Sequence, residues 1–441
     1  MLESNGLSSR SRQLFGNVIG SSFYKGINII VGFLLVRYAI EFSDEETYGI
    51  WLTLSSFFTW FSAVEVGIGN SLRSRITTLF TSSKFQEIRA LLVKGYKALL
   101  ITYGIVVTAL IIPPLFWDIE IFFVPRGAHY ENFGFIFQLC LALYMLHYVF
   151  AFLNMLLLSV HKARTTFLIA AVQNTVLLVG VLIFLESDVT PSLALLCIWF
   201  SAVPAFVLGL ANIVAFRSIL KKMRPSFSEI VFTKPERFKE MNYGFLIIQV
   251  CTLVIYATDH IIISNFISGT EVTKYAVTFK YFNVITVVFN LVLVPYWASF
   301  AEAMQMNDRK WITKNIRFLS LLIGALSILG VIMVFFSNSV YSLWIGKDLS
   351  IPILLSALMC VSVLLTAWYN IFVYYLSSIN QITWQMRLII IGAIINVPLS
   401  LLFIQKMGSS GVILATSISL LPMAIALPIQ SFSLLKSDAD K

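Results

Sequence analysis

Charged residues are scarce in this sequence. Only 12% of its 441 residues are Asp, Glu, Lys or Arg, against ~25% in typical soluble domains. No polar stretch approaches the ~50 residues that a separate soluble domain needs. By contrast, 58% of the residues are hydrophobic and the mean hydropathy is +0.86. These values exclude an ordinary soluble enzyme and indicate an all-α polytopic membrane protein.

Cysteine and histidine are also few, with four residues of each. The cysteines stand singly inside apolar segments, at positions 140, 197, 251 and 360. Neither residue type shows the close spacing of a metal or redox motif. We therefore expect no metal centre, no cofactor and no disulfide framework.

Long hydrophobic runs organise the chain. The first run, from Leu14 to about Ala39, exceeds the ~7–15 apolar residues of a signal peptide. Segments of about 20 apolar residues cross a bilayer as helices. The sequence predicts twelve of them, at 14–37, 48–68, 95–116, 134–160, 165–186, 192–216, 243–266, 271–298, 315–337, 351–378, 387–405 and 411–435.

The net charge of +9 is distributed unevenly. Lys and Arg gather in one set of connecting loops and at both ends, whereas the opposite loops are rich in Asp and Glu. By the positive-inside rule, both termini are expected in the cytoplasm. The basic excess is therefore explained mainly by membrane topology, and it gives no reason to expect nucleic-acid binding. The alternative interpretation is that these Lys and Arg residues also attract anionic headgroups or a pyrophosphate substrate.

The chain divides near its middle. A polar, basic stretch at about 217–241 predicts a cytoplasmic linker between two six-helix bundles, 1–220 and 221–441. The halves resemble a repeat, because ETYGI at 46–50 and TKYAV at 273–277 each open a span and each precede a basic amphipathic segment. Duplicated halves are common in secondary transporters, whose substrate sites lie between the repeats.

Polar stripes mark the seventh and eighth spans, within 241–267 and 271–300. Spacings of three and four put each stripe on one helix face. A charge deep in a bilayer costs ~2.5–3.5 kcal/mol, so these faces should meet each other or a hydrated interior. The stripes comprise Gln249, Thr252, Tyr256 and Asp259, and Lys280, Asn283, Thr286 and Asn290.

The first half carries similar stripes on its first two spans. They include Asn17, Ser21, Lys25 and Asn28, and then Ser55, Thr59, Ser62 and Glu65. Later spans add isolated polar residues that could face the same interior. The candidate cavity residues are Ser21, Lys25, Asn28, His147, Lys280, Asn283, Asn290 and Asn370.

The intramembrane charges have two interpretations. Asp259 and Lys280 could form a structural ion pair, or Asp259 could exchange a proton or a sodium ion while Lys280 or Lys25 contacts an anionic substrate. Lys25 could instead pair with an acid from another helix, such as Asp259. Glu65 is a second candidate for ion coupling, with pairing to Arg73 or Arg75 as its alternative.

Several motifs resemble Wzx-type O-antigen and polysaccharide flippases. YGIW at 48–51 and EVGIGNSLR at 65–73 match the pattern "YGlW … DxGlGnglR", with Glu65 where the pattern has Asp. INVPLS at 395–400 and GSSGVILAT at 408–416 resemble the eleventh and twelfth helices of that family. PYWASFAEA at 295–303 resembles the segment after its eighth helix.

The resemblance implies the fold of the multidrug/oligosaccharidyl-lipid/polysaccharide exporters, in which two six-helix bundles form a V around a central cavity. It implies a non-enzymatic flippase of the bacterial inner membrane that moves an undecaprenyl-pyrophosphate-linked oligosaccharide to the periplasmic leaflet by alternating access. H⁺ or Na⁺ coupling is an option, and membrane lipids and other polysaccharide-assembly proteins are candidate partners. The alternatives are a multidrug/cation antiporter and, less favoured, a glycan polymerase.

Overall fold

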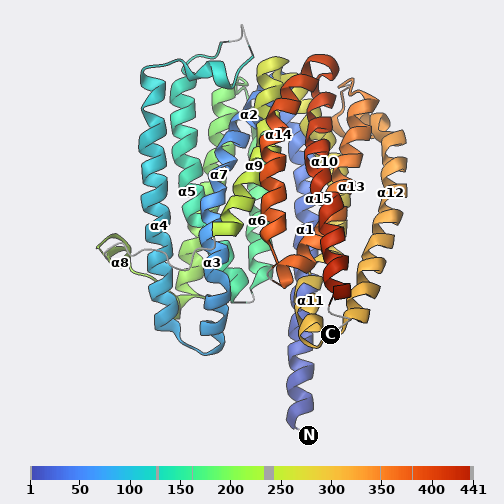
Figure 1. Ribbon diagram of the computed structural model, residues 1–441. Helices are drawn as coiled ribbons and strands as arrows, with labels where there is room; N and C mark the ends of the chain where they lie inside the picture. The colour runs from blue at the N-terminus through green and yellow to red at the C-terminus, as the bar shows by residue number, and fades with distance from the viewer. Residues whose placement is uncertain are drawn as a thin grey trace. The chain divides into compact units, whose positions relative to one another are not determined.

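The chain is helical throughout the part that the structure describes. The computed structural model covers residues 2–125, 129–160, 162–232, 243–347, 349–379 and 381–437, with side chains from residue 23 onward apart from a few positions. Within these ranges every regular element is a helix (Figure 1). Twelve helical segments are long and apolar enough to cross a membrane. The prediction of an all-α polytopic membrane protein with twelve spans is confirmed.

The chain forms two compact units. Unit 1 contains Met1–Trp51, Phe61–Phe122 and Ala128–Tyr243. Its elements are α1 (Leu2–Ser43), the first half of α2 (Glu45–Thr59), α3 (Ser62–Thr81), α4 (Phe85–Ile111), η1 (Pro113–Leu115), η2 (Ile119–Phe122), α5 (Phe133–Ser159), α6 (Ala163–Glu186), α7 (Leu193–Arg217), η3 (Lys221–Met223) and α8 (Phe227–Phe232).

Unit 2 contains Leu52–Trp60, Phe123–Gly127 and Gly244–Lys441, so the end of α2 belongs to it. Its remaining helices are α9 (Tyr243–Phe266), α10 (Gly269–Leu293), α11 (Tyr296–Gln305), α12 (Arg309–Ile345), α13 (Ile353–Ser378), α14 (Thr383–Met407) and α15 (Ser409–Ser437). The expected linker at 217–241 falls partly on residues outside the described ranges. The division at 220/221 and the V-shaped arrangement stay predictions.

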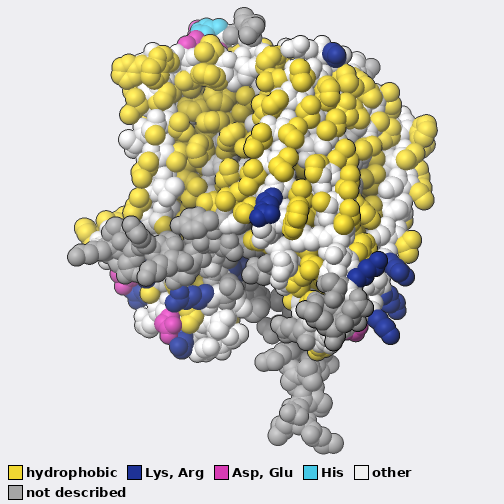
Figure 2. Space-filling model, viewed as in Figure 1, with side chains coloured by type: hydrophobic (Ala, Val, Ile, Leu, Met, Phe, Trp, Pro, Cys, Tyr) yellow, Lys and Arg dark blue, Asp and Glu magenta, His cyan; other side chains and the backbone are white. Residues whose placement is uncertain are grey.

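Apolar helix faces hold each unit together. In unit 1, α1 packs along α6, and α5 packs between α3 and α7. In unit 2, α15 packs against both α13 and α14, while α10 and α12 pack on α13. Many large apolar side chains also point outward, and Figure 2 shows hydrophobic side chains over most of the visible face. A soluble protein would expose fewer such contiguous patches, so this surface suits contact with lipid.

The second predicted span, 48–68, is not one continuous helix. It is divided at Trp60 and Phe61 into α2 and α3. The Phe61 carbonyl accepts a hydrogen bond from the Tyr103 hydroxyl at 2.9 Å, which satisfies a backbone group at the break. Neither Trp60 nor Phe61 is a Gly or Pro, so no local sequence signal predicts the interruption.

The ends of several other predicted spans differ from the observed helices, and two of them have a clear local cause. The eighth span, expected at 271–298, ends at Leu293, and Pro295 precedes the separate helix α11, because proline lacks the N–H that would continue a helix. The ninth span, expected at 315–337, is the long helix α12. It runs from Arg309 to Ile345, with Asp308 as its N-cap and with Gly346, whose φ of 77° suits glycine, as its C-cap.

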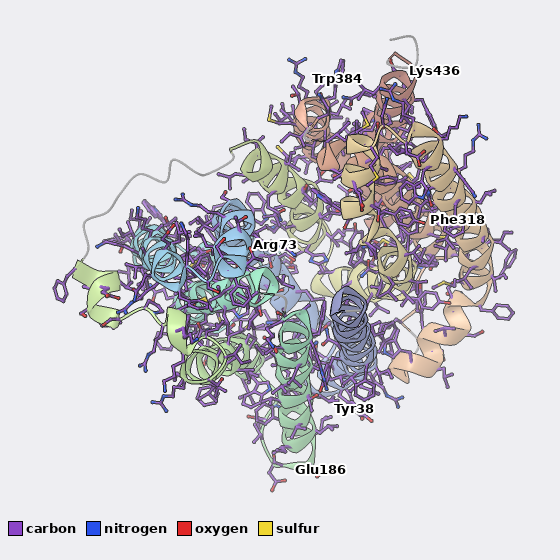
Figure 3. All side chains as sticks on the ribbon, turned by 90° about the horizontal axis from the view of Figure 1, so that it is seen from below. Tyr38, Arg73, Glu186, Phe318, Trp384 and Lys436 are labelled. Carbon is purple, nitrogen blue, oxygen red and sulfur yellow. The ribbon has the colours of Figure 1, made fainter. Side chains whose placement is uncertain are left out.

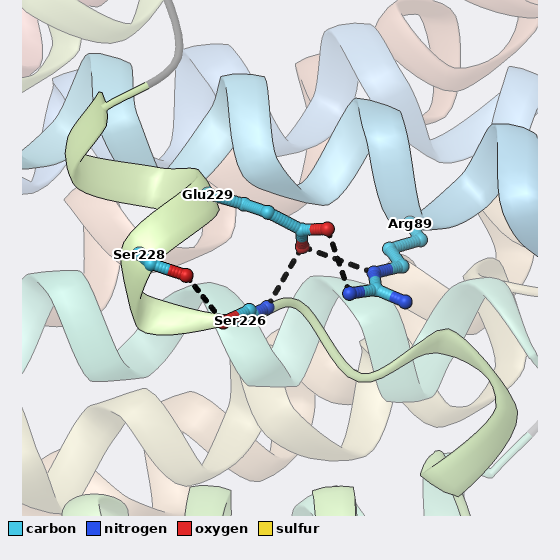
Figure 4. Close-up of polar contacts among 4 residues, drawn as sticks. All are labelled: Arg89, Ser226, Ser228 and Glu229. Atoms are coloured by element: carbon cyan, nitrogen blue, oxygen red, sulfur yellow. Dashed lines mark hydrogen bonds and ion pairs between the residues drawn. The ribbon is translucent and has the colours of Figure 1, made fainter.

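Helix α8 is tied to unit 1 by an ion pair. Two nitrogens of the Arg89 guanidinium donate to the two carboxylate oxygens of Glu229, at 2.7 and 3.0 Å (Figure 4). The Ser226 N–H donates to the same carboxylate at 3.0 Å. Phe227 and Phe232 at the ends of α8 remain 77% and 83% exposed, so α8 is a docked amphipathic helix with an uncovered apolar side.

Candidate functional site

Unit 2 contains a partly open cavity of about 370 Å³, lined by residues of α9, α10, α13, α14 and α15. This volume lies within the ~300–1,000 Å³ typical of small-ligand pockets. Apolar and aromatic side chains form much of the wall, among them Phe279 and Met359. The polar lining residues are Thr252, Tyr256, His260, Tyr275, Asn283, Thr286, Ser362, Thr366, Tyr369, Asn370 and Gln385.

The two polar stripes of the sequence meet at this cavity. Thr252 and Tyr256 reach it from α9, and Asn283 and Thr286 reach it from α10. Asn370 joins them from α13. The Tyr256 hydroxyl lies 3.1 Å from Thr366 Oγ1 and thereby links α9 to α13. The structure thus brings together two of the predicted cavity residues, Asn283 and Asn370.

Asp259 lies directly behind the cavity wall and is fully buried. Its Oδ2 accepts hydrogen bonds from the Tyr275 hydroxyl at 2.6 Å and from the Thr416 hydroxyl at 3.2 Å. Asn396 Nδ2 donates in turn to Thr416 Oγ1 at 3.1 Å. Four helices (α9, α10, α14 and α15) therefore contribute to one buried polar network whose centre is a carboxyl group.

The predicted ion pair between Asp259 and Lys280 is not formed within the described residues. Tyr275 and Thr416, both uncharged, are the partners of the Asp259 carboxyl group. Lys280 lies on α10 one helical turn before Asn283, partly buried and outside the cavity lining. The structure therefore favours hydrogen bonding over charge pairing as the means by which this buried acid is held.

His260 connects this network to α2. Its ring meets that of Tyr275 edge-on, with centroids 5.7 Å apart. Its Nδ1 shares a hydrogen bond with the Ser56 hydroxyl, from the part of α2 that belongs to unit 2. His260 also lines the cavity, so it lies between the cavity and this α2 segment.

Asn290 lies farther along α10, away from the cavity lining. Its Oδ1 is buried without a hydrogen-bond partner among the described residues. An unsatisfied buried oxygen costs about 1–3 kcal/mol. Asn290 is therefore a second place on α10 where a ligand group or water could be held.

The predicted residues of unit 1 lie on three of its helices, α1, α3 and α5. Lys25 lies 4.5 Å from the centre of the Phe167 ring, and Asn28 Oδ1 accepts a hydrogen bond from Asn174 at 2.6 Å. The polar face of α1 is therefore turned toward α6. Ser21 belongs to α1, but its side chain lies outside the described residues.

Glu65 and His147 occupy different helices of unit 1, α3 and α5. Glu65 is partly buried on α3. No ion pair joins it to Arg73 or Arg75 in the described part of the chain. The His147 ring packs beside Tyr148, with centroids 5.2 Å apart.

Sequence reasoning missed the partners of Asp259. Tyr275 belongs to the repeat motif at 273–277, and Asn396 and Thr416 belong to the family-like motifs at 395–400 and 408–416. Asn396 and Thr416 are polar residues inside apolar spans, and both are fully buried. Their position within apolar segments was the one sequence signal that could have indicated a buried polar network. The described residues contain no group of three or more His, Cys, Asp or Glu side chains that could hold a metal ion.

Comparisons with known proteins find similarity along most of this chain. No family model matches it. A Salmonella typhi protein named "Putative O-antigen transporter" is 23% identical over 412 residues, which cover 90% of this chain and 91% of that protein. A protein of the same name from Salmonella typhimurium is 25% identical over 180 residues, which cover 40% and 41% of the two chains.

The solved structures give the fold. A multidrug resistance MATE family transporter of the MOP superfamily, in an inward-facing conformation, matches with a TM-score of 0.68 and 13% identity over 93% of this chain and 95% of that one. An outward-facing structure with the same description matches with a TM-score of 0.64 and 13% identity over 96% of each chain. The chain is thus a multi-pass membrane protein with the fold of these transporters, and its relatives support a role in membrane transport.

Proposed function

We propose that this protein is a flippase that moves an undecaprenyl-pyrophosphate-linked oligosaccharide from the cytoplasmic to the periplasmic leaflet of a bacterial inner membrane. The similarity to an O-antigen transporter over 90% of the chain supports this substrate class. The observation that carries the proposal is the cavity of unit 2, where aromatic rings and side-chain amides line one pocket.

The cavity chemistry suits a sugar. Rings such as Tyr256, Tyr369 and Phe279 can pack against the apolar face of a pyranose, while Asn283 and Asn370 can exchange hydrogen bonds with its hydroxyls. A volume of about 370 Å³ holds a sugar-sized group rather than a long glycan. The rest of the oligosaccharide would extend beyond the pocket, and the polyprenyl tail would stay in lipid.

The pyrophosphate and the coupling ion would use the intramembrane charges. Lys280 lies one turn from Asn283 on α10, and Lys25 lies on α1; either ammonium could contact the pyrophosphate. Asp259 would exchange H⁺ or Na⁺, because a buried carboxyl group held only by hydroxyls can gain or lose a cation without breaking an ion pair. Glu65 is the corresponding candidate in unit 1. Both termini would lie in the cytoplasm, beside the proteins that assemble the glycan.

A second candidate is an antiporter of organic cations. It is favoured by the absence of Lys and Arg from the described lining of the cavity and by the burial of Asp259 behind it. Aromatic rings can hold a cation as well as a sugar. A drug-susceptibility panel on a deletion strain separates the two, since only the antiporter changes drug tolerance.

The direct test uses purified protein in liposomes that contain an undecaprenyl-pyrophosphate-linked oligosaccharide. A membrane-impermeant lectin reports the fraction of glycan on the outer leaflet over time. The proposal predicts faster exchange with the protein than with empty liposomes. Unchanged exchange, together with efflux of a fluorescent organic cation, would favour the antiporter, and a lengthened glycan would indicate a polymerase.

A further inference from the structure

The first turns of α12 carry a row of basic residues on one face. Arg309, Lys310, Lys314 and Arg317 follow the helical period together with Thr313. With Phe318 and Leu321 they line a shallow groove of about 610 Å³ on the surface of unit 2. This groove shares no residue with the cavity that we assign to the substrate, so it needs its own explanation.

The groove is lined by positively charged side chains, and no acidic side chain among its described lining residues balances them. Lys310, Lys314 and Arg317 are exposed. The neighbouring Asp308 is occupied as the helix cap, where its carboxylate accepts the Trp311 N–H at 3.0 Å. Arg309 contacts Asn307 Oδ1 at 2.9 Å and the Leu435 carbonyl at 3.5 Å. Three cations therefore face the groove at closely spaced positions.

Apolar side chains continue the same face beyond the cations. Phe318 is 51% exposed and Leu321 is 74% exposed. At ~1.5 Å per residue, Leu321 lies ~10 Å along the helix from Lys314. Figure 2 shows Lys and Arg side chains gathered at this end of α12 beneath hydrophobic ones, and Figure 3 labels Phe318 on α12 at the outer edge of unit 2. The groove is thus cationic at one end and apolar at the other.

We propose that this groove binds an anionic phospholipid. The lipid phosphate would lie among Lys310, Lys314 and Arg317, and an acyl chain would follow Phe318 and Leu321 along α12. A basic residue close to an anionic headgroup contributes attraction that is additive over a small cluster. A soluble anion would use the cations but leave the apolar end of the groove empty, so the combination selects a lipid.

The test compares lipid binding to the purified protein by native mass spectrometry. Phosphatidylglycerol and phosphatidylcholine with identical acyl chains are titrated into the wild type and into the triple variant K310Q/K314Q/R317Q. A matched control, R217Q/K221Q/R224Q, removes three exposed cations near η3 instead. Inorganic phosphate at millimolar concentration is added as a competitor in a parallel series.

The wild type and the control should bind phosphatidylglycerol about tenfold or more tightly than phosphatidylcholine, and the groove variant should lose this preference. Phosphate should compete weakly. Equal binding of the two lipids by the wild type, or an equal loss in both triple variants, would overturn the proposal. Full competition by phosphate would identify the groove as a site for a soluble anion. Thermal unfolding of each variant checks that its fold is retained, and L321N offers a second variant that should weaken lipid binding without a change in charge.

Discussion

The Tyr275 hydroxyl donates a 2.6 Å hydrogen bond to the Asp259 carboxyl group. The contact joins α10 to α9, and Thr416 adds a second donor from α15. Both Asp259 and Thr416 are fully buried, and Tyr275 is 4% exposed. Because a buried polar group without partners is costly, these hydroxyls give the carboxyl group a stable place beside the cavity.

Replacing Tyr275 with Phe removes one donor from this buried acid. We expect the free energy of unfolding to fall by about 1–3 kcal/mol, because the carboxyl group loses a short hydrogen bond that water cannot replace. The measurement is chemical or thermal unfolding of the purified protein in detergent. Y374F is the matched control, since the Tyr374 ring packs edge-on against Trp297 on the same unit. Equal stability of the two variants would contradict the assigned role of Tyr275.

The amides of the cavity should affect transport more than stability. N283A and N370A each remove a hydrogen-bonding group from the cavity lining, and the loss of one such bond corresponds to about a three- to tenfold slower transport of glycan. Flipping in liposomes provides the rate. S320A on α12 is the control, because among the described residues that hydroxyl donates only to the Ile316 carbonyl of its own helix. A normal rate in the double variant N283A/N370A would exclude this cavity as the sugar site.

Close packing in unit 1 provides a test of the fold itself. A Cβ added to Gly180 on α6 would lie 2.0 Å from the Trp199 ring of α7, so G180A must displace this indole. Such overpacking typically costs about 1–3 kcal/mol, and we expect a lower unfolding temperature. Gly104 on α4 has no atom within 4 Å of the corresponding position. G104A should therefore be neutral or slightly stabilising, and similar behaviour of the two variants would argue against the α6–α7 contact.

The ion pair at α8 should make the docking of this helix depend on pH. The hydrogen bond from the Ser226 N–H and the ion pair with Arg89 lower the pKa of Glu229. A lowered pKa means that the stabilisation is present above the ordinary glutamate pKa and is lost as the pH falls through the lowered value. Hydrogen exchange of 227–232, corrected for its intrinsic pH dependence, should therefore show protection at pH 7 that declines in acid.

The variant E229Q provides the control for that effect. It cannot ionise and cannot form the charged pair with Arg89, so α8 should exchange faster at neutral pH and lose its acid dependence. An unchanged acid dependence in E229Q would show that another group controls the docking of α8.

Hydropathy alone was sufficient to predict the twelve spans, because each crossing helix must be apolar over its own length. The polar faces of α9 and α10 were equally predictable, since the helical period is local. The break between α2 and α3 was not predictable from local sequence. The Phe61 carbonyl at the break is satisfied by the hydroxyl of Tyr103, which lies 42 residues away in the sequence.

The partners of Asp259 were also beyond local reasoning. Charge complementarity suggested Lys280, which is close in sequence. The structure supplies Tyr275 and Thr416 instead, and Thr416 is 157 residues from Asp259. A sequence pattern gives the face on which a side chain lies, but long-range packing decides which neighbour reaches it.

The measurement that tests the central claim most directly is the membrane leaflet that holds lipid-linked oligosaccharide in cells lacking this protein. The account predicts accumulation on the cytoplasmic face, reversed by the wild-type gene but not by variants K25A or D259N expressed at normal levels. Normal delivery of the glycan to the periplasmic face without the protein would contradict the proposed function and would direct attention to organic cations or another lipid.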